Sequence, residues 1–562
     1  MPRLSLGISD FKQLRREPSY YVDKSMLARN VIDAGQCVLI PRPRRFGKTL
    51  NLSMLRYFFE HGDDGNRSLF DGLAIADDSE AMEHQGRYPV IALTLKDVKF
   101  PTWPLAKQRF AKEIGRAYRA FAHVNDGLSK SEAAAFVRLM DEEGTDSDLA
   151  DSLESLITHI SHYYDQPVVV LIDEYDTPVT EARSNGYYDD MIKFMQSWLG
   201  AGLKHQDGTS IFRAVITGCL RIAKESLFSG LNNFTSYPMR RISPYEDKFG
   251  FTQDEVDQLL AAFEIPDFEV PIRQWYNGYQ IGRTTIYNPW SVLMCVHGYP
   301  NEPEPHWLNT ASNKLVFEEM DRGGPELKRD LEKLLNGEEV RYPIDDSIIF
   351  GEIGTNPNHI WSFLYNAGYL KAESPEPYLL SPTAKTYKLS IPNLEISTIY
   401  EKFVNRLFDP HTGCGIEEFL DCFVCSKPDD HIERTLQALV LSLVSHHDTA
   451  RQPEAVFHAF VLGLLANLRS IYEIRSNAES GYGRADIMLR PKTDQYPFGY
   501  VIEFKSVKES EEIDTVLSDA LEQIERKEYT TQLCDVGIAH EHLRRLAIVL
   551  QGKTIHVRSA DG

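Results

Sequence analysis

The sequence predicts an α/β fold divided among about three domains, the first built on a parallel sheet flanked by helices. The chain has 562 residues, more than one hydrophobic core usually organises at roughly 100–200 residues per domain. Its first half alternates short apolar runs with longer helical stretches, the pattern of strands covered on both faces by helices. Strands followed by an amphipathic helix recur near the C-terminus, which predicts a second α/β domain there. The predicted boundaries are 1–250, 251–395 and 396–562.

The composition is that of an ordinary globular protein, with 42% hydrophobic and 25% charged residues. We find no basic leader with an apolar run behind it and no apolar stretch near the ~18 residues that span a membrane, so we expect a cytoplasmic protein without a membrane partner. A net charge of −22 disfavours nonspecific adhesion to nucleic acid. Local basic clusters such as Arg42, Arg44 and Arg45 must therefore do any phosphate binding.

The seven cysteines are scattered and odd in number, so reduced thiols are expected. Cys422 and Cys425 have C-x-x-C spacing, with Cys414 upstream and His431 downstream as conceivable zinc partners. The surrounding run IEEFLDCFVC favours the other interpretation, in which the pair lies on the buried stripe of a helix.

The strands of the first domain follow from near-continuous apolar runs, which fit strands buried on both faces. They are Cys37–Ile40, Pro89–Leu95, Val168–Asp173 and Arg213–Gly218. From Phe251 the pattern turns helical, with Thr252 and Glu255 spaced as a capping box. Further on, residues 358–373 predict a helix and residues 378–393 a hairpin, a winged-helix-like order. With few Lys or Arg on it, this module is expected to pack as a lid more readily than to read DNA.

A candidate phosphate loop lies in residues 37–55, CVLIPRPRRFGKTLNLSML, which run as strand, loop and helix. Backbone N–H groups at the helix start, the helix dipole and the Lys48 ammonium favour a polyphosphate there, and the Thr49 hydroxyl can ligate Mg²⁺. The loop departs from the standard P-loop motif G-x-x-x-x-G-K-[ST] at its first glycine, because Arg42 stands at that position and Pro43 follows it. The candidate nucleotide contacts in this loop are Arg44, Arg45, Phe46, Gly47, Lys48 and Thr49.

Two later strands supply the rest of this site. PVVVLIDEYD delivers Asp173 to hold Mg²⁺ and Glu174 to orient or deprotonate the attacking water. RAVITGCLR places Thr217 near a γ-phosphate and Arg221 where it can stabilise transition-state charge. The plainer alternatives are an acidic strand end, a helix cap and a surface cation. Together with the phosphate loop, these strands predict that the chain binds ATP and Mg²⁺.

A second acidic constellation lies near the C-terminus. GYGRADIML contains Asp486, and GYVIEFKSV contains Glu503 and Lys505, which lie on the same side of a strand because they are two residues apart. The two carboxylates can bind Mg²⁺ or Mn²⁺, which polarises a phosphodiester and acidifies water, while Lys505 steadies the nucleophile. The alternative is a salt-bridged pair on an edge strand.

The sequence resembles a family of AAA-ATPase-like bacterial and archaeal proteins that commonly carry a C-terminal PD-(D/E)XK nuclease domain. The resemblance runs from Leu6 to about Tyr529, through YYVDKSMLARNVI, RPRRFGKTLNLSML, LIDEYDTPV, FSGLNNF, FGFTQDEV, WYNGYQIG, YNPWSVL and LSIPNLEI. It implies a P-loop parallel-sheet ATPase domain of the ASCE or AAA type, a helical and winged-helix-like middle segment and a C-terminal α/β nuclease fold. The arginine-rich phosphate loop is the usual form in that family.

The same resemblance implies a catalytic set at the C-terminal site. That set is Glu454, Asp486, Glu503 and Lys505, with Gln523 as an auxiliary contact. Glu454 is predicted on a preceding helix, and Gln523 and Tyr529 on a following one. Apart from the resemblance, Arg484 and Lys508 either contact the nucleic-acid backbone or are solvated surface charges, which is the more frequent fate of such residues. Glu479 either supports the metal ligands or is a structural carboxylate.

These features predict an ATP-regulated, Mg²⁺-dependent endonuclease that cleaves nucleic acid, with DNA the expected substrate and homo-oligomerisation compatible with the sequence. Pairing an ATPase with a nuclease points to defence or mobile-element handling as its setting. The alternative is a nucleotide-dependent binding or scaffold protein whose nuclease fold does not cleave. A hydrolase of small esters is disfavoured because we find no G-x-S-x-G elbow.

Overall fold

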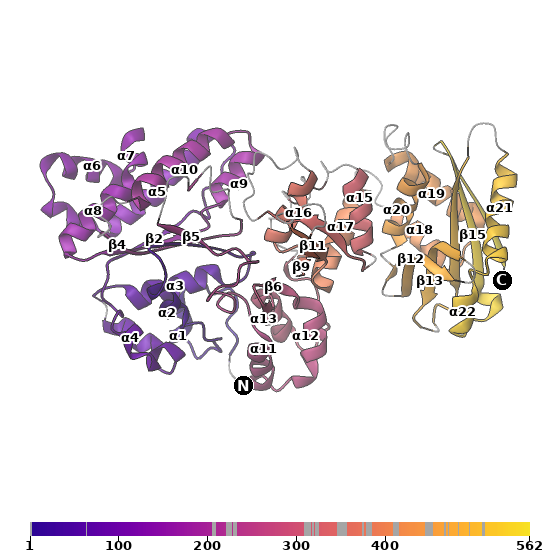
Figure 1. Cartoon of the computed structure of the whole chain (residues 1–562), viewed down its shortest axis with the longest axis horizontal. Coiled ribbons are helices and arrows are strands. Elements are labelled where there is room, and N and C mark those ends of the chain that lie inside the picture. The colour runs from indigo at the N-terminus through magenta and orange to yellow at the C-terminus, as the bar shows by residue number, and fades with distance from the viewer. Residues whose placement is uncertain are drawn as a thin grey trace. The chain divides into compact units, whose positions relative to one another are not determined.

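The computed structural model divides the chain into two compact units (Figure 1). One comprises Met1–Glu319 with Arg341–Ile396, and the other comprises Met320–Val340 with Ser397–Gly562. The predicted boundary near residue 250 falls inside the first unit and stays a prediction. The structure describes all residues except 1–2, 63, 205–209, 221–226, 229–232, 308–315, 317–319, 321–324, 336, 346–356, 374–375, 378–384, 408–414, 444–452, 466–467, 470, 481–482, 494, 508–511, 553 and 562.

The first unit is built on a five-stranded parallel sheet of order β2-β3-β4-β1-β5. Its strands are β1 (Cys37–Pro41), β2 (Val90–Thr94), β3 (Val168–Asp173), β4 (Ile211–Gly218) and β5 (Phe234–Ser236). The predicted strands are confirmed as β1 to β4, and every residue of β1 and β3 is buried. Because all strands run the same way, the residues that follow β1, β3 and β4 meet at one edge of the sheet.

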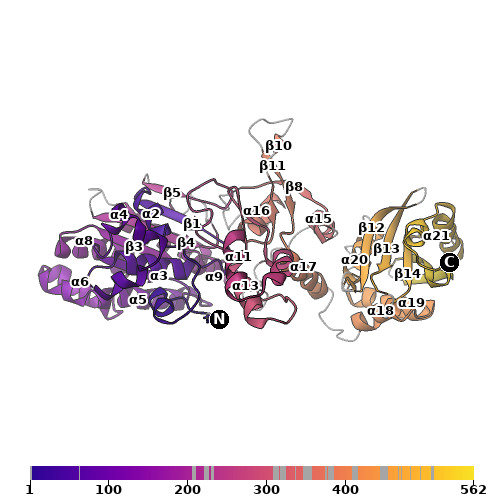
Figure 2. The same ribbon diagram turned by 90° about the horizontal axis from the view of Figure 1, so that it is seen from below.

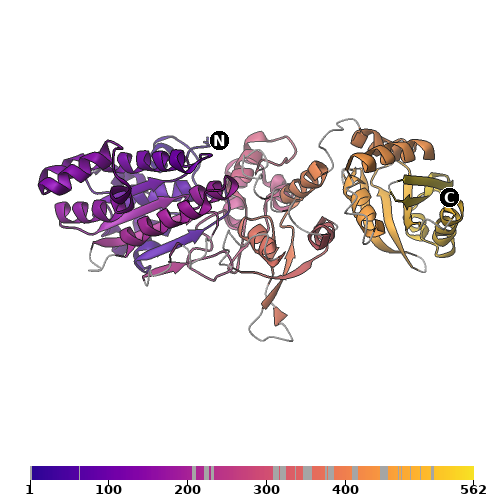
Figure 3. The same ribbon diagram turned by 90° about the horizontal axis from the view of Figure 1, so that it is seen from above.

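Helices cover both faces of this sheet. Figure 1 shows α1 to α4 on one face and α5 to α10 on the other, and Figure 3 shows the second layer running over the strands. The bounds are α1 Phe11–Arg16, α2 Leu27–Ile32, α3 Lys48–Phe59, α4 Ser79–Met82, α5 Trp103–Ala120, α6 Lys130–Met140, α7 Asp146–Ala150, α8 Ser152–Tyr164, α9 Thr177–Ser184 and α10 Tyr188–Leu203.

The helical segment that follows packs around its own core. Its elements are α11 (Gln253–Ala262), α12 (Glu269–Tyr276), β6 (Tyr279–Ile281), β7 (Thr284–Ile286) and α13 (Pro289–Gly298). The predicted capping box is confirmed, since the Thr252 hydroxyl accepts from the Glu255 N–H and the Glu255 carboxylate accepts from the Thr252 N–H. Val256, Leu259 and Ile272 lie in the core with no exposed surface.

The helix predicted over residues 358–373 is present but ends at Asn366, and of the hairpin predicted over residues 378–393 only the second strand is described, because residues 378–384 lie outside the described part of the chain. The elements here are α16 (Pro357–Asn366), β9 (Lys371–Ala372), β10 (Glu376–Pro377) and β11 (Lys385–Ser390), and β8 (Val340–Pro343) joins the same sheet. Trp361, Leu364 and Tyr365 of α16 are at most 1% exposed. This burial favours packing over DNA reading for α16, because a recognition helix must present side chains to the groove.

The second unit contains a five-stranded sheet of order β12-β13-β14-β15-β16, antiparallel except for the pair β14–β15. The strands are β12 Tyr472–Ser480, β13 Gly483–Pro491, β14 Gly499–Ser506, β15 Leu543–Gln551 and β16 Thr554–Asp561. The sequence predicted β13 and β14 but missed β12, β15 and β16. Figure 2 shows α18 to α20 and α21 around this sheet.

Two apolar layers distinguish the faces of this sheet. Residues of α18 to α20 share a core with alternate residues of β14, such as Tyr500 and Ile502. The other face, with Met488 and Val501, packs on α21 and the short α22. The helices are α15 Pro325–Leu335, α17 Leu394–Leu407, α18 Gly415–Val424, α19 Asp429–Leu443, α20 Pro453–Leu465, α21 Ile513–Arg526 and α22 Thr531–Asp535.

The C-x-x-C pair does not share one environment. Cys422 lies in α18 with no exposed surface, as the helix interpretation predicts, whereas Cys425 follows the end of the helix and is exposed. Cys414 lies outside the described residues. Within the described part of the chain, no helix is long and apolar enough to cross a bilayer.

Candidate functional sites

The phosphate loop joins β1 to α3 in a conformation suited to anions. Arg45 and Gly47 both adopt left-handed backbone angles, with φ of 68° and 81°. Gly47 caps the N-terminus of α3 without a side chain, which leaves the first N–H groups of the helix open to a ligand. Left-handed residues in such a turn make a concavity lined with N–H groups, and the helix dipole adds positive potential. The backbone here fits a phosphate group.

Arg42 corrects the expectation that it binds phosphate. Its guanidinium is fully buried and donates to the carbonyl oxygens of Pro41 and Tyr237 at 2.8 Å and of Tyr245 at 3.1 Å. Burial lowers the pKa of Arg42 to about 10. The residue that replaces the first glycine therefore ties the loop to residues 237–245, and its charge is directed away from the phosphate position.

The Lys48 side chain reaches back across the phosphate loop to its first residues. Its ammonium donates to the carbonyl oxygens of Arg42 at 3.0 Å and Pro43 at 2.9 Å, and lies 3.5 Å from the Cys219 sulfur. Lys48 is only 5% exposed. A bound polyphosphate would compete with these two carbonyl oxygens for the ammonium, and a phosphate carries more charge than a carbonyl.

Asp173 collects the hydroxyl groups expected around a magnesium ion. One carboxylate oxygen accepts from Thr49 at 2.6 Å and the other from Thr217 at 2.7 Å. Asp173 is 4% exposed at the end of β3. A buried carboxylate flanked by a hydroxyl from the phosphate loop supplies the hard oxygen ligands that Mg²⁺ prefers. The structure thus brings together three predicted residues from three separate segments.

Asp176, for which the sequence predicts no role, lies at the same edge of the sheet. It is 3% exposed and accepts from the N–H groups of Cys219 and Leu220 at 2.9 Å each. Burial raises its pKa. Burial also acts to lower the pKa of Arg44, but Cys219, Asp176 and Glu174 outweigh it and raise that pKa. Arg44 therefore interacts electrostatically with the acidic groups at this edge of the sheet.

Of the two predicted catalytic groups of this site, Glu174 lies at the end of β3, next to Asp173. Glu174 has a left-handed backbone with φ of 53°, and its carboxylate accepts from the Thr177 hydroxyl at 3.2 Å. It is partly exposed. Arg221 lies outside the described residues.

The loop side chains that point away from the site contact the helical segment. The Arg45 guanidinium stacks on Trp290, 4.5 Å from the ring centroid, and the Phe46 ring packs edge-on against Tyr279 at 5.0 Å. Phe46 is 1% exposed, so only its backbone is left for a nucleotide. At Gly368, where φ is 89°, an added Cβ would lie 2.9 Å from Pro43. The corner after α16 therefore lies directly on the phosphate loop.

The C-terminal acids converge on one end of β13 and β14. Asp486 accepts from the Phe504 N–H at 2.8 Å, which fixes its carboxylate beside β14. One oxygen of Glu503 accepts from the Lys505 ammonium at 2.9 Å and from the Gln523 amide of α21. The predicted acids, lysine and glutamine thus share one side of the sheet. Glu503 and Lys505 do form a salt bridge, as the plainer interpretation expected, but β14 lies inside the sheet and not at its edge.

The second oxygen of Glu503 is buried and has no hydrogen-bond partner among the described residues. Burial and the nearby Asp486 raise the pKa of Glu503 to about 7. Two carboxylates close together in a buried place repel each other unless a cation lies between them. The donor set therefore fits a divalent cation coordinated by oxygen.

Three further predicted residues, Glu454, Glu479 and Arg484, are placed by their backbone alone. Glu454 lies in the first turn of α20, one turn before His458, whose ring nitrogen lies 3.0 Å from the Asp486 carbonyl oxygen. Glu479 and Arg484 are cross-strand neighbours on β12 and β13. The structure describes no side chain for these three predicted residues, and Lys508 lies outside the described part. Among the described side chains, no three His, Cys, Asp or Glu residues form a metal-binding group.

Tyr529 corrects an expectation. It lies beyond the end of α21 at Arg526, and its ring is 3% exposed in the apolar cluster with Met488 and Val501. It supports the face of the sheet that carries the acids, and it does not extend the helix.

Comparisons with known proteins match both halves of this architecture. A family described as predicted AAA-ATPase matches residues 5–228, and the PD-(D/E)XK nuclease superfamily matches residues 452–560. An uncharacterized protein from the vnfD 5′ region of Azotobacter chroococcum mcd 1 is 25% identical over 537 residues, covering 94% of this chain and 93% of that protein.

A solved structure is also similar, that of a STAND (Signal Transduction ATPase with Numerous Domains) protein with a tetratricopeptide repeat sensor from Pyrococcus horikoshii. It is 12% identical, with a TM-score of 0.22, and the match covers 80% of this chain and 54% of that chain. A TM-score this low says nothing about shared architecture. The two family matches coincide with the parallel sheet of the first unit and the mixed sheet of the second, so the chain carries an AAA-ATPase-like domain at its N-terminal end and a PD-(D/E)XK nuclease superfamily domain at its C-terminal end.

Proposed function

We propose that the chain is an ATP-controlled, divalent-metal-dependent endonuclease that cleaves phosphodiester bonds of nucleic acid, with DNA as the expected substrate. The observation that carries this proposal is the buried oxygen of Glu503, beside Asp486 and Lys505, for which the described residues offer no hydrogen-bond donor. A protein that only bound nucleic acid would gain nothing from two acids facing a polyanion without a metal between them.

At the nuclease site, Asp486 and Glu503 hold Mg²⁺ or Mn²⁺, with Glu454 as a further ligand. A bound divalent cation polarises the scissile phosphate and lowers the pKa of a bound water. Lys505 orients the nucleophile and offsets the charge that develops on the phosphate. Gln523 and Lys505 both hold one oxygen of Glu503, which leaves the second oxygen available to coordinate a divalent cation when one is bound.

At the nucleotide site, the loop from Arg44 to Thr49 holds the phosphates, and Asp173 with Thr49 holds Mg²⁺. Thr217 orients Asp173. Glu174 is placed to orient a water molecule for hydrolysis, and Arg221 to stabilise transition-state charge.

The two sites communicate, in this proposal, through the helical segment. The phosphate loop already contacts that segment through Arg45 and Phe46. Tyr279 in turn contacts Trp307, whose N–H donates to Glu395 at 2.8 Å. Glu395 lies in the first turn of α17, and that helix continues into the unit that carries the nuclease site. A nucleotide that reshapes the loop therefore acts on a helix leading to the second unit.

The test is cleavage of single-stranded DNA, plasmid DNA and RNA with Mg²⁺ or Mn²⁺, with and without ATP. Lys505→Ala should lower cleavage at least 100-fold, since removing a single charge-stabilising donor typically costs 10²–10³ in rate. Arg434→Ala is the matched control, because Arg434 is 69% exposed on α19 and, within the described part of the chain, forms an ion pair with Asp430 one turn before it. Equal cleavage by wild type and Lys505→Ala would refute the catalytic assignment.

A further inference from the structure

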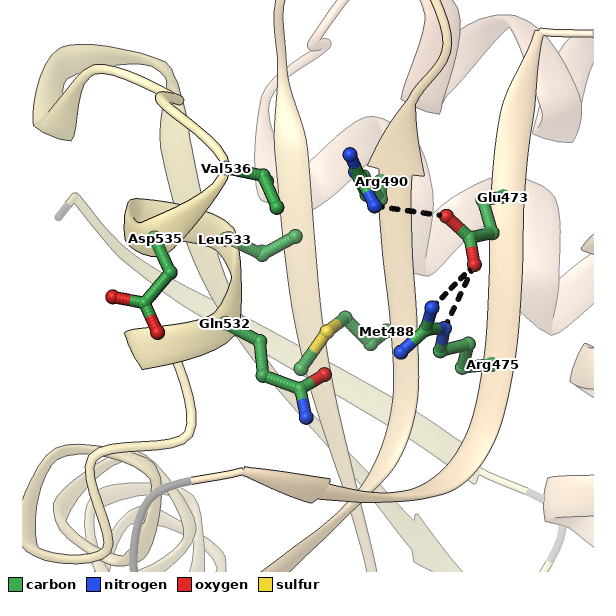
Figure 4. A pocket seen from close by; sticks show the side chains of 8 residues that line it. All are labelled: Glu473, Arg475, Met488, Arg490, Gln532, Leu533, Asp535 and Val536. Atoms are coloured by element: carbon green, nitrogen blue, oxygen red, sulfur yellow. Dashed lines mark hydrogen bonds and ion pairs between the residues drawn. The ribbon is translucent and has the colours of Figure 1, made fainter.

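A pocket of about 250 Å³ lies on the nuclease sheet, apart from the catalytic acids. Figure 4 shows Glu473, Arg475, Met488 and Arg490 on two neighbouring strands, and residues of a short helix opposite them. The strands are β12 and β13, where Glu473 pairs with Arg490 and Arg475 with Met488. The opposite wall is formed by Gln532, Leu533, Asp535 and Val536.

The strand wall is positively charged and held in place. Glu473 accepts from Arg475 at 2.6 and 2.9 Å and from Arg490 at 3.3 Å. The hydrogen bond from Arg475 lowers the pKa of Glu473, and Lys492 contributes in the same direction. The two guanidinium groups thus outnumber the one carboxylate of the strand wall, and Glu473 engages only part of each guanidinium. Lys492 does not line the pocket, and its ammonium donates to the Arg469 carbonyl oxygen. In Figure 4 the Asp535 carboxylate is directed away from both arginines.

Both arginines are open to a ligand. The Arg475 side chain is 48% exposed and that of Arg490 is 41% exposed. Planar guanidinium groups held in one orientation are the usual partners of phosphate oxygens. The other surfaces of the pocket are apolar, from Met488, Leu533 and Val536, and Gln532 adds an amide that can both donate and accept. A phosphate and a base would each find a matching surface.

The pocket opens on the face of the sheet that carries the catalytic acids. Met488 and Arg490 lie on the same side of β13, and Met488 shares an apolar cluster with Val501 of β14. Val501, Glu503 and Lys505 alternate along β14, so Glu503 and Lys505 lie on that same face of the sheet. Arg490 lies about 13 Å along the strand from Asp486, at 3.3 Å per residue. That length corresponds to about four stacked nucleotides at 3.4 Å each, and to fewer in an extended strand. A nucleic-acid strand cleaved at Asp486 can therefore reach the pocket.

We propose that this pocket binds one unpaired nucleotide of the substrate strand, with its phosphate on Arg475 and Arg490 and its base against Met488, Leu533 and Val536. The inference rests on the proposed nuclease function and adds a substrate class to it. A base can enter the pocket only when it is free of its complement, so the pocket selects single-stranded DNA or unpaired ends over intact duplex.

The test measures binding without cleavage. The full chain carrying Lys505→Ala is titrated against a fluorescent single-stranded oligonucleotide and its duplex at several salt concentrations. We expect Arg475→Ala and Arg490→Ala each to weaken single-strand binding about 5- to 10-fold. Each should also reduce the slope of log affinity against log salt by about 0.7, the loss of one phosphate contact. Arg434→Ala, on the helices that cover the opposite face, should change neither quantity.

Two results would overturn the inference. The first is unchanged single-strand binding in folded Arg475→Ala and Arg490→Ala variants. The second is competition by thymidine monophosphate as strong as that by the oligonucleotide, because the pocket would then be a site for free nucleotides. If an alanine variant fails to fold, Arg475→Gln and Arg490→Gln decide, since glutamine keeps much of the side chain and removes only the charge, and should weaken single-strand binding to a similar extent; no change would count against the proposal. Arginine-dependent binding without any wild-type cleavage would reject the nuclease function alone. Cleavage with arginine-independent binding would reject only the pocket.

Discussion

Gly218 shows at the residue scale how closely the nucleotide site is packed. A Cβ added there would lie 2.7 Å from the Tyr175 ring and closer still to the Asp176 carboxylate. Neither neighbour can move freely, because Tyr175 donates to the Leu220 carbonyl oxygen and Asp176 accepts from two N–H groups. The glycine is needed for space, since its backbone lies in an ordinary strand.

Gly218→Ala should therefore destabilise the N-terminal unit by about 1–3 kcal/mol, as overpacking of a core does. It should also weaken Mg·ATP binding, because Thr217 and Asp176 must shift. Gly200→Ala is the control, since nothing lies within 4 Å of a Cβ added at that position in α10, and an alanine in a helix is slightly stabilising. Thermal unfolding with and without Mg·ATP checks both variants, and an unchanged midpoint for Gly218→Ala would contradict the steric account.

Residues whose side-chain type reveals their chemistry could be predicted from the sequence. Residues whose role depends on which distant groups the fold brings to them could not. Asp173, Thr49 and Thr217 were predicted together, and their carboxylate and hydroxyl groups do meet. Asp176 lies three residues after Asp173 and was overlooked, because only the fold brings the N–H groups of Cys219 and Leu220 to it. The same holds for Arg42, whose buried carbonyl partners come from residues distant in the sequence.

At the scale of elements, helix α17 begins at a buried acid. Glu395 has no exposed surface, and it accepts from the Ser291 hydroxyl at 2.8 and 2.9 Å and from the Trp307 N–H at 2.8 Å. Burial raises its pKa from 4.5 to about 7, against the effect of these hydrogen bonds. The acid thus connects α13, the segment around Trp307 and the start of α17.

This shift predicts a pH-dependent stability. Below pH 4.5 the Glu395 carboxyl group is protonated in both the folded and the unfolded chain. As the pH rises from 4.5 to about 7, the unfolded chain releases its proton first, so the free energy of unfolding falls over that range. Relative to Glu395→Gln, wild type should lose on the order of 3 kcal/mol of unfolding free energy across it. Chemical unfolding of both proteins from pH 4.5 to 8 tests this, with the exposed Glu154→Gln as control. A constant difference between wild type and Glu395→Gln would exclude the shift.

At the scale of the whole molecule, the contacts of the phosphate loop with the helical segment should carry the response to ATP. Trp290→Leu removes the ring on which Arg45 stacks, outside the predicted phosphate contacts. We expect this variant to bind ATP within a few-fold of wild type while the effect of ATP on cleavage is reduced, because the loop no longer acts on its neighbour. Lys48→Ala should lose ATP binding and the ATP effect together.

Parallel measurements of ATP affinity and ATP-dependent cleavage separate these variants. If Trp290→Leu responded to ATP as wild type does, the route through this contact would be wrong, although both sites could still function. If ATP changed cleavage in Lys48→Ala, control by this nucleotide site would be wrong.

Much of this protein is set by local sequence. The apolar runs predict β1 to β4 because strands covered by helices on both faces consist mainly of apolar residues, and in β1 and β3 every residue is buried. The Thr252–Glu255 capping box marks where a helix begins. The strand-borne acids Asp173, Asp486 and Glu503 could be assigned because each follows or interrupts such a run.

Tertiary structure alone decided where distant segments meet. Arg42, Asp176 and Glu395 are each hydrogen-bonded to residues far away in the chain. Gly368 lies against Pro43, more than 300 residues before it in the sequence. The pocket around Arg475 and Arg490 likewise combines residues of two strands and a helix. A periodic pattern states which face of an element is buried, but not which element buries it. Those pairings depend on the packing of whole layers, and so the chemistry they create appears only when the chain is folded.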